Sequence, residues 1–148
     1  MCALRFSTDM KNYIVNKAIV GVMAGTCGTA GTASIKIYTG TQPATGDAGT
    51  SGTLLCTISN IGWATGTGTT SGTAALANTA GYAGTAVATG TAGWARMETV
   101  GVGYDGSAAT HRIDGDVGTA GTCNFVINVV GITSGGVVTL LTAPVSMA

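Results

Sequence analysis

Apolar and polar residues alternate with a period of two along much of the chain after residue 33, which indicates β-strands with one buried face. The alternation runs through Ser34–Tyr38, Leu54–Ser59 and Arg112–Val117. In each segment every second residue is apolar or small, so one face can meet a core while the other faces solvent. The pattern therefore predicts at least three half-buried strands.

Another strand is expected around Trp94 and Arg96, which share one face, while small and apolar residues occupy the other. The most apolar strand-like segments are Phe125–Val130 and Val137–Leu141, and the glycine-rich turn Thr133–Gly136 separates them. The strands are short, their spacing is irregular and no regular helix–strand alternation occurs. The sequence thus predicts a mainly β fold, namely an antiparallel β-sandwich of jelly-roll or Ig-like type.

The region before the first strand has a different period. Apolar residues such as Met10, Ile14 and Ala18 recur three to four positions apart, and Ser7 or Thr8 can cap a helix. We expect one short helix over residues 8–22. The following stretch, residues 24–32, contains mostly glycine, threonine and alanine and is expected to be a loop.

The segment 60–91 is nearly all glycine, threonine and alanine. Its large apolar residues, Trp63, Leu76, Tyr82 and Val87, are the candidates for contact with neighbouring subunits. One interpretation is that loose edge strands at 74–78 and 85–89 are completed by a neighbour, and the alternative is a long mobile loop. We favour edge strands, because threonine is a strand former and few charges would keep a loop solvated.

Composition strengthens the expectation of assembly. Only 8% of the 148 residues are charged and the net charge is zero, whereas about a quarter of the residues of a typical soluble domain are charged. A surface of this kind tends to associate. The length suits a single domain over residues 1–148, with the sandwich over 34–142.

Residues suited to catalysis or metal binding are few. The single histidine, His111, has no nucleophile motif around it, so we predict that the chain is not an enzyme and uses no cofactor. Asp114 and Asp116 could serve a calcium ion, but their spacing fits no EF-hand, and they are better interpreted as solvated turn carboxylates that pair with Arg96 or Arg112.

The four cysteines, Cys2, Cys27, Cys56 and Cys123, share no metal-binding spacing. We interpret Cys56 and Cys123 as buried thiols, while a disulfide between some pair stays open. The six basic residues are scattered, which argues against direct nucleic-acid binding, and no apolar run reaches the about 18 residues of a membrane span.

Three ordered segments resemble a known family. They are IKIYTGTQPATGDAGTSGTLLCTIS at 35–59, TGTAGWARM at 89–97 and RIDGDVGTAGTCNFVI at 112–127. Together with the expected helix, they resemble small virion proteins of tailed bacteriophages. The resemblance implies an all-β sandwich and a structural role on the particle.

On this resemblance we expect a capsid decoration, or cement, protein that binds the outer shell and stabilises it. The expected partners are the major capsid protein or other virion proteins, and copies of this chain in dimers or trimers. The expected location is the virion, assembled in the host cytoplasm. The alternatives are a neck, tail or fibre component, or a carbohydrate- or host-binding module in which Trp63, Tyr82 and Trp94 stack on sugar rings.

Overall fold

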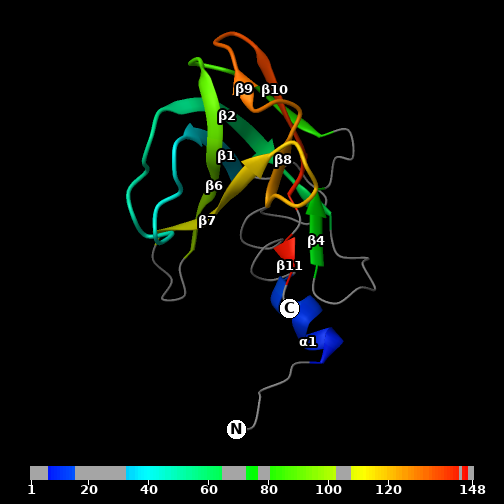
Figure 1. Cartoon of the computed structure of the whole chain (residues 1–148). Helices are drawn as coiled ribbons and strands as arrows, with labels where there is room; N and C mark the ends of the chain where they lie inside the picture. Colours follow the sequence, from blue (N-terminus) through cyan, green and yellow to red (C-terminus); the bar gives the residue numbers. More distant parts are fainter. Residues whose placement is uncertain are drawn as a thin grey trace, which may run out of the picture.

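The alternating segments form strands in the computed structural model, which describes residues 7–15, 33–64, 73–76, 81–102, 108–143 and 145–146 (Figure 1). The mainly β prediction is confirmed. The elements are, in order, α1 (Thr8–Val15), β1 (Ala33–Thr39), β2 (Leu54–Ile61), β3 (Trp63–Ala64), β4 (Thr73–Leu76), β5 (Tyr82–Thr85), β6 (Gly90–Val102), β7 (Ala108–Gly118), β8 (Phe125–Ile127), β9 (Gly131–Ile132), β10 (Val137–Thr142) and β11 (Val145–Ser146).

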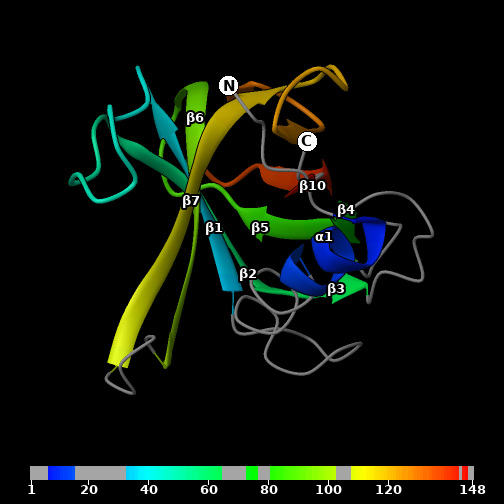
Figure 2. The ribbon, with the colours of Figure 1, turned by 90° about the horizontal axis from the view of Figure 1, so that it is seen from below.

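The main sheet curls until it is nearly closed into a barrel. Its strands follow the order β2-β1-β6-β7-β8-β10-β5, and β9 pairs with the start of β6. Neighbours are antiparallel except β7 and β8, which are parallel. The far ends of β6 and β7 run together away from the barrel (Figure 2). The strand order therefore describes a nearly closed barrel, and the two-layer sandwich expected from the sequence is not confirmed.

The two end strands of the sheet, β2 and β5, meet at the seam of the barrel. Cys56 forms an isolated bridge with Ala86, and the Val87 N–H donates to the Leu55 carbonyl at 2.8 Å. Gly84 permits this approach, since a Cβ there would lie 2.4 Å from the Thr57 carbonyl oxygen. The seam therefore depends on a residue without a side chain.

The inward faces of the strands form one apolar core. Its fully buried members include Ile35, Ile37, Ile58, Met97 and Leu140. Each comes from the apolar positions of the period-two pattern, so burial follows directly from the alternation.

Below the barrel, β4 is the central strand of a small sheet with the order β11-β4-β3. The strand expected at 74–78 is present over Thr73–Leu76, and residues 77–78 lie outside the described residues. Its expected edge position is wrong, because β3 and β11 flank β4 on its two sides. The expected edge strand at 85–89 is also displaced, since β5 ends at Thr85 and pairs with β10.

Helix α1 begins beside Ser7, whose hydroxyl accepts the Met10 N–H at 3.2 Å. The remainder of the expected helix, residues 16–22, lies outside the described residues, and so does the expected loop at 24–32.

Candidate functional site

The outer face of β1, β6 and β7 carries half of the charged residues of the chain. The register places Lys36 beside Arg96 and Arg96 beside Asp114, while Glu98 lies beside Arg112 and Trp94 beside Asp116. This face therefore holds three basic and three acidic residues in adjacent rows. Opposite charges that face each other across neighbouring strands stabilise the pairing.

The centre of this face is a buried ion pair. Arg96 donates from Nε and Nη2 to the two carboxylate oxygens of Asp114, each at 2.7 Å, and Nη2 also donates to the Ala48 carbonyl at 3.0 Å. The side chains are 2% and 4% exposed. The hydrogen bonds that Arg96 donates to Asp114 raise the pKa of Arg96, so the guanidinium stays charged although burial acts against it.

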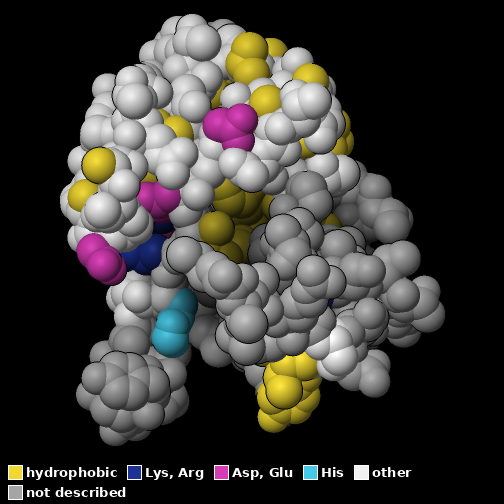
Figure 3. All heavy atoms as spheres, turned by 60° about the horizontal axis from the view of Figure 1, so that its bottom comes forward, with side chains coloured by type: hydrophobic (Ala, Val, Ile, Leu, Met, Phe, Trp, Pro, Cys, Tyr) yellow, Lys and Arg dark blue, Asp and Glu magenta, His cyan; other side chains and the backbone are white. Residues whose placement is uncertain are grey.

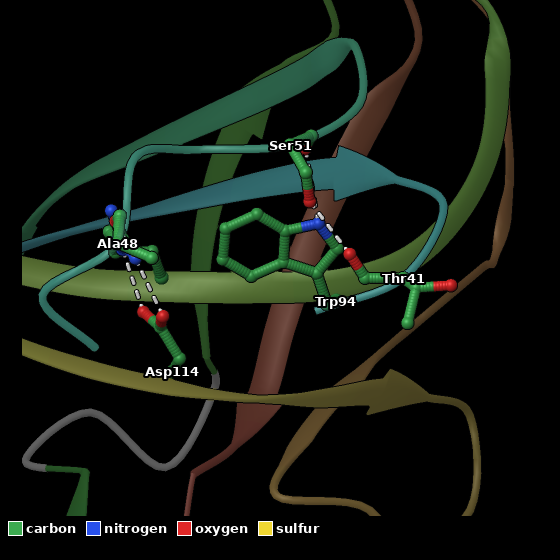
Figure 4. Close-up of polar contacts among 6 residues, drawn as sticks. Thr41, Ala48, Ser51, Trp94 and Asp114 are labelled. Atoms are coloured by element: carbon green, nitrogen blue, oxygen red, sulfur yellow. Dashed lines mark hydrogen bonds and ion pairs between the residues drawn. The ribbon is translucent and has the colours of Figure 1, made fainter. Parts of the chain in front are cut away.

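An aromatic pair lies next to the ion pair. Tyr38 and Trp94 stack with ring centroids 4.7 Å apart, and the Arg96 guanidinium lies 5.5 Å from the Trp94 ring centroid. The Trp94 indole N–H donates to the Ser51 carbonyl at 3.3 Å (Figure 4). Trp94 is fully buried. Its ring is therefore not available to stack on a sugar, which corrects one part of the carbohydrate-binding alternative.

The loop between β1 and β2, residues 40–53, covers these side chains. Besides the two carbonyls that accept from Arg96 and Trp94, the Ser51 hydroxyl donates to the Thr41 carbonyl at 2.7 Å. At the base of the loop, the Thr39 N–H donates to the Thr53 carbonyl, and the Thr53 N–H donates to the Thr39 hydroxyl. We refer to this segment as the β1–β2 loop.

The two aspartates do not lie in a turn. Both belong to β7, and Asp114 is buried against Arg96, so the interpretation as solvated turn carboxylates is wrong for this residue. Pairing with Arg96, one of the two expected arginines, is confirmed. Asp116 is exposed, and its carboxylate accepts the Asn124 N–H at 2.8 Å. Within the described residues no group of three potential metal-ligating side chains occurs.

The other side of the barrel has the opposite character. Strands β2, β5, β8, β9 and β10 contain no Asp, Glu, Lys or Arg. The large apolar side chains that this part of the barrel exposes are Val87, Val129, Val137 and Leu141, with Val87 64% and Val137 61% exposed. We call the outer surface of β5 and β10, with Val87, the uncharged face. Figure 3 views another side of the molecule, on which acidic and basic side chains lie among uncharged ones.

The four predicted contact residues lie in different surroundings. Val87 is on the uncharged face, whereas Leu76 is 9% exposed and packs into the core, which leaves little of it for a neighbour. Tyr82 is half-buried, and its hydroxyl donates to the Gly62 carbonyl at 3.2 Å. Trp63 pairs with Leu76 in the small sheet, and its side chain is outside the described part of the structure.

The remaining candidates for chemistry are separated from one another. Cys56 is a buried free thiol, as predicted, and burial raises its pKa. Cys123 is also free but only partly buried, and Cys2 and Cys27 lie outside the described residues. His111 lies on β7, and its Nε2 is buried without a hydrogen-bond partner.

Two surfaces were missed by sequence reasoning. The β1–β2 loop is held mainly through carbonyl oxygens, which leave no signature in the sequence. Val137 and Leu141 belong to a segment predicted as one of the most apolar strands, and the burial of Val138 and Leu140 between them shows that they face outward.

No protein-family profile, curated protein or solved structure matches the chain. Within the described part of the chain, no helix has the length and apolar character needed to span a bilayer.

Proposed function

We propose that the chain is a structural protein of a tailed-bacteriophage particle and that it decorates the outer shell as a cement protein. The uncharged face is the observation that carries this proposal. It exposes Val137 and Leu141 on β10 and Val87 just after β5, and neither strand contains Asp, Glu, Lys or Arg. Depletion of charge distinguishes the buried centre of protein interfaces from the rest of a protein surface.

The neighbours of these side chains strengthen the interpretation. Ala83 and Thr85 lie on the β5 part of the face, opposite Thr139 and Val137 of β10. These side chains are short, so little rotamer freedom is lost when a partner orders them. Copies joined in a dimer or trimer would bind equivalent sites of a symmetric shell together, so a small contact per copy can be strengthened by avidity.

The pairing of charges in the other half of the barrel also supports a structural role. Arg96 and Asp114 are committed to each other under the β1–β2 loop, and Lys36 is paired with Glu98. We propose a role in assembly without enzymatic activity. Dimers or trimers of this chain on the shell are part of the proposal.

The proposed architecture is a modified form of the expected sandwich. A nearly closed barrel that is flattened has two opposed layers, here β1–β6–β7 and β5–β10. We propose that this flattening is how the expected sandwich is realised.

The test is to count copies in purified particles of the phage that carries the gene. A decoration protein is expected in the hundreds per particle, because it follows the symmetry of the shell, whereas a count of about a dozen would favour a neck or tail component. Absence of the chain from particles would refute both.

A paired substitution tests the uncharged face itself. Val137→Lys places a charge on this face at an exposed position, so it should abolish binding to particles that lack the protein while leaving thermal stability unchanged. Thr110→Lys is the matched control, since Thr110 is exposed on β7 in the charged half. Equal binding of the two variants would contradict an interface at the uncharged face.

A further inference from the structure

The β1–β2 loop is much longer than its connection requires. β1 and β2 are antiparallel neighbours, with Tyr38 paired to Leu54, yet residues 40–53 lie between the strands. Two to five residues are enough to join such a pair. Ordered loops of this length usually have a function beyond connection.

The backbone of the loop is held from beneath. The Ala48 and Ser51 carbonyls accept hydrogen bonds from Arg96 and Trp94, both buried on β6. Gly52 adopts a positive φ of 78° and packs so tightly that a Cβ would lie 2.0 Å from the Thr39 carbonyl oxygen. A loop that is fixed before contact loses less entropy on binding than a free one.

The side chains of the loop point away from these anchors. Every residue from 40 to 53 is exposed except Pro43 and Ala48, which are half-buried. Thr41 contributes its carbonyl to the network, and Gln42, Thr45 and Asp47 are exposed. The backbone carbonyls of the loop bind the barrel, so most of the loop side chains are free to contact a partner.

We propose that the outward side chains of the β1–β2 loop form a recognition surface for a folded protein that presents hydrogen-bonding groups and a lysine or arginine. The loop offers hydroxyl and amide groups and a single charge, the Asp47 carboxylate. It exposes no aromatic ring or long aliphatic chain, so apolar burial cannot supply the affinity. Hydrogen bonds and one ion pair give specificity, which the uncharged face lacks.

A protein partner fits better than a carbohydrate. Sugar binding relies on exposed aromatic rings, and the rings near this loop, Tyr38 and Trp94, are buried beneath it. The loop and β10 lie on opposite sides of the barrel (Figures 1 and 2). The chain can therefore contact one shell subunit through the loop and another through the uncharged face. This inference rests on the proposed function, in which the loop partner is the shell protein.

The experiment compares two triple variants of the full chain in binding to particles that lack it. Gln42→Ala, Thr45→Ala and Asp47→Ala together should weaken binding by about tenfold or more, which corresponds to about 1.4 kcal/mol, with an unchanged thermal midpoint. Thr119→Ala, Thr122→Ala and Thr133→Ala alter exposed threonines elsewhere and should bind like the wild type. Asp47→Asn alone should reduce the salt dependence of binding.

The possible binding results distinguish the loop inference from the proposed function. If the wild type binds and the loop variant binds equally well, the loop inference is overturned and the proposed function stands. If the wild type does not bind particles, both fail. A lower thermal midpoint of the loop variant would show that these side chains serve the fold, and binding of the wild type to a glycan array that the loop variant loses would replace the protein partner by a carbohydrate.

Discussion

Replacing Asp114 with alanine leaves the Arg96 guanidinium buried without its counter-charge. We expect this change to lower the free energy of unfolding by about 3–5 kcal/mol, the range observed when one partner of a buried ion pair is removed. Bulk water cannot solvate the guanidinium in place of the carboxylate, because both side chains are almost fully covered by the β1–β2 loop and the sheet.

The hydrogen bonds give a second route to the same magnitude. The carboxylate accepts two charge-assisted bonds at 2.7 Å, and each such bond contributes about 1.5–3 kcal/mol. In the variant, the Arg96 guanidinium keeps only its hydrogen bond to the Ala48 carbonyl and its position over the Trp94 ring. For a chain of this size the loss corresponds to a decrease of about 10–15 °C in the thermal midpoint.

Urea unfolding followed by tryptophan fluorescence measures the loss, and two variants serve as controls. Glu98→Gln breaks the Lys36–Glu98 pair, whose side chains are 34% and 21% exposed, and should cost less than about 1 kcal/mol. The double variant Arg96→Met, Asp114→Ala removes both charges and should cost less than the sum of the single changes.

The reasoning would be refuted if Asp114→Ala cost less than about 1 kcal/mol, the typical value for an exposed pair. Additive losses of unfolding free energy in the double-mutant cycle would refute it as well. Either result would show that the ion pair is hydrated in solution and that the β1–β2 loop does not seal it.

Two further predictions concern the seam between β2 and β5. Gly84→Ala should destabilise the protein by about 1–3 kcal/mol, because the new Cβ meets the Thr57 carbonyl, whereas Gly46→Ala meets nothing within 4 Å and should be nearly neutral in thermal unfolding. The Cys56 thiol should be alkylated more slowly than Cys123, as peptide mapping can show, because burial raises its pKa. An unfolded thiol ionises above about pH 8.5. The contribution of Cys56 to the free energy of unfolding is therefore complete below that pH and is lost as the pH rises through the raised pKa of the folded protein. If Cys56→Ala left the dependence of stability on pH unchanged, this prediction would be contradicted.

The strands of the barrel could be predicted because their alternation is a local property. Ile35 and Ile37 point inward, while Lys36 and Tyr38 point outward, as the pattern requires. The pairing of Asp114 was left open between Arg96 and Arg112, since Arg112 lies two residues before Asp114 on the same strand face and Arg96 lies on another predicted strand. Only the register of β6 and β7 selects Arg96.

Other features depend on contacts that have no local signal. β11 pairs with β4 although about seventy residues separate them, and both strands are short and made of small residues. The anchors of the β1–β2 loop are carbonyl oxygens, which every residue possesses, so no residue type indicates them. The parallel pairing of β7 with β8 likewise depends on the path of the intervening turn.

The strand order also has a consequence for how the protein folds. β1 pairs with β2 nearby in the chain and with β6 more than fifty residues away, and β5 pairs along its length with β10, the last strand of the main sheet. The barrel thus cannot close until residue 142 has been synthesised, and contacts between distant segments slow folding. During translation, the apolar face of β1 and β2 stays exposed until the later strands have been synthesised. The chain has few charges to repel other copies, so this is the stage most exposed to aggregation, and a chaperone present then should raise the yield of folded protein.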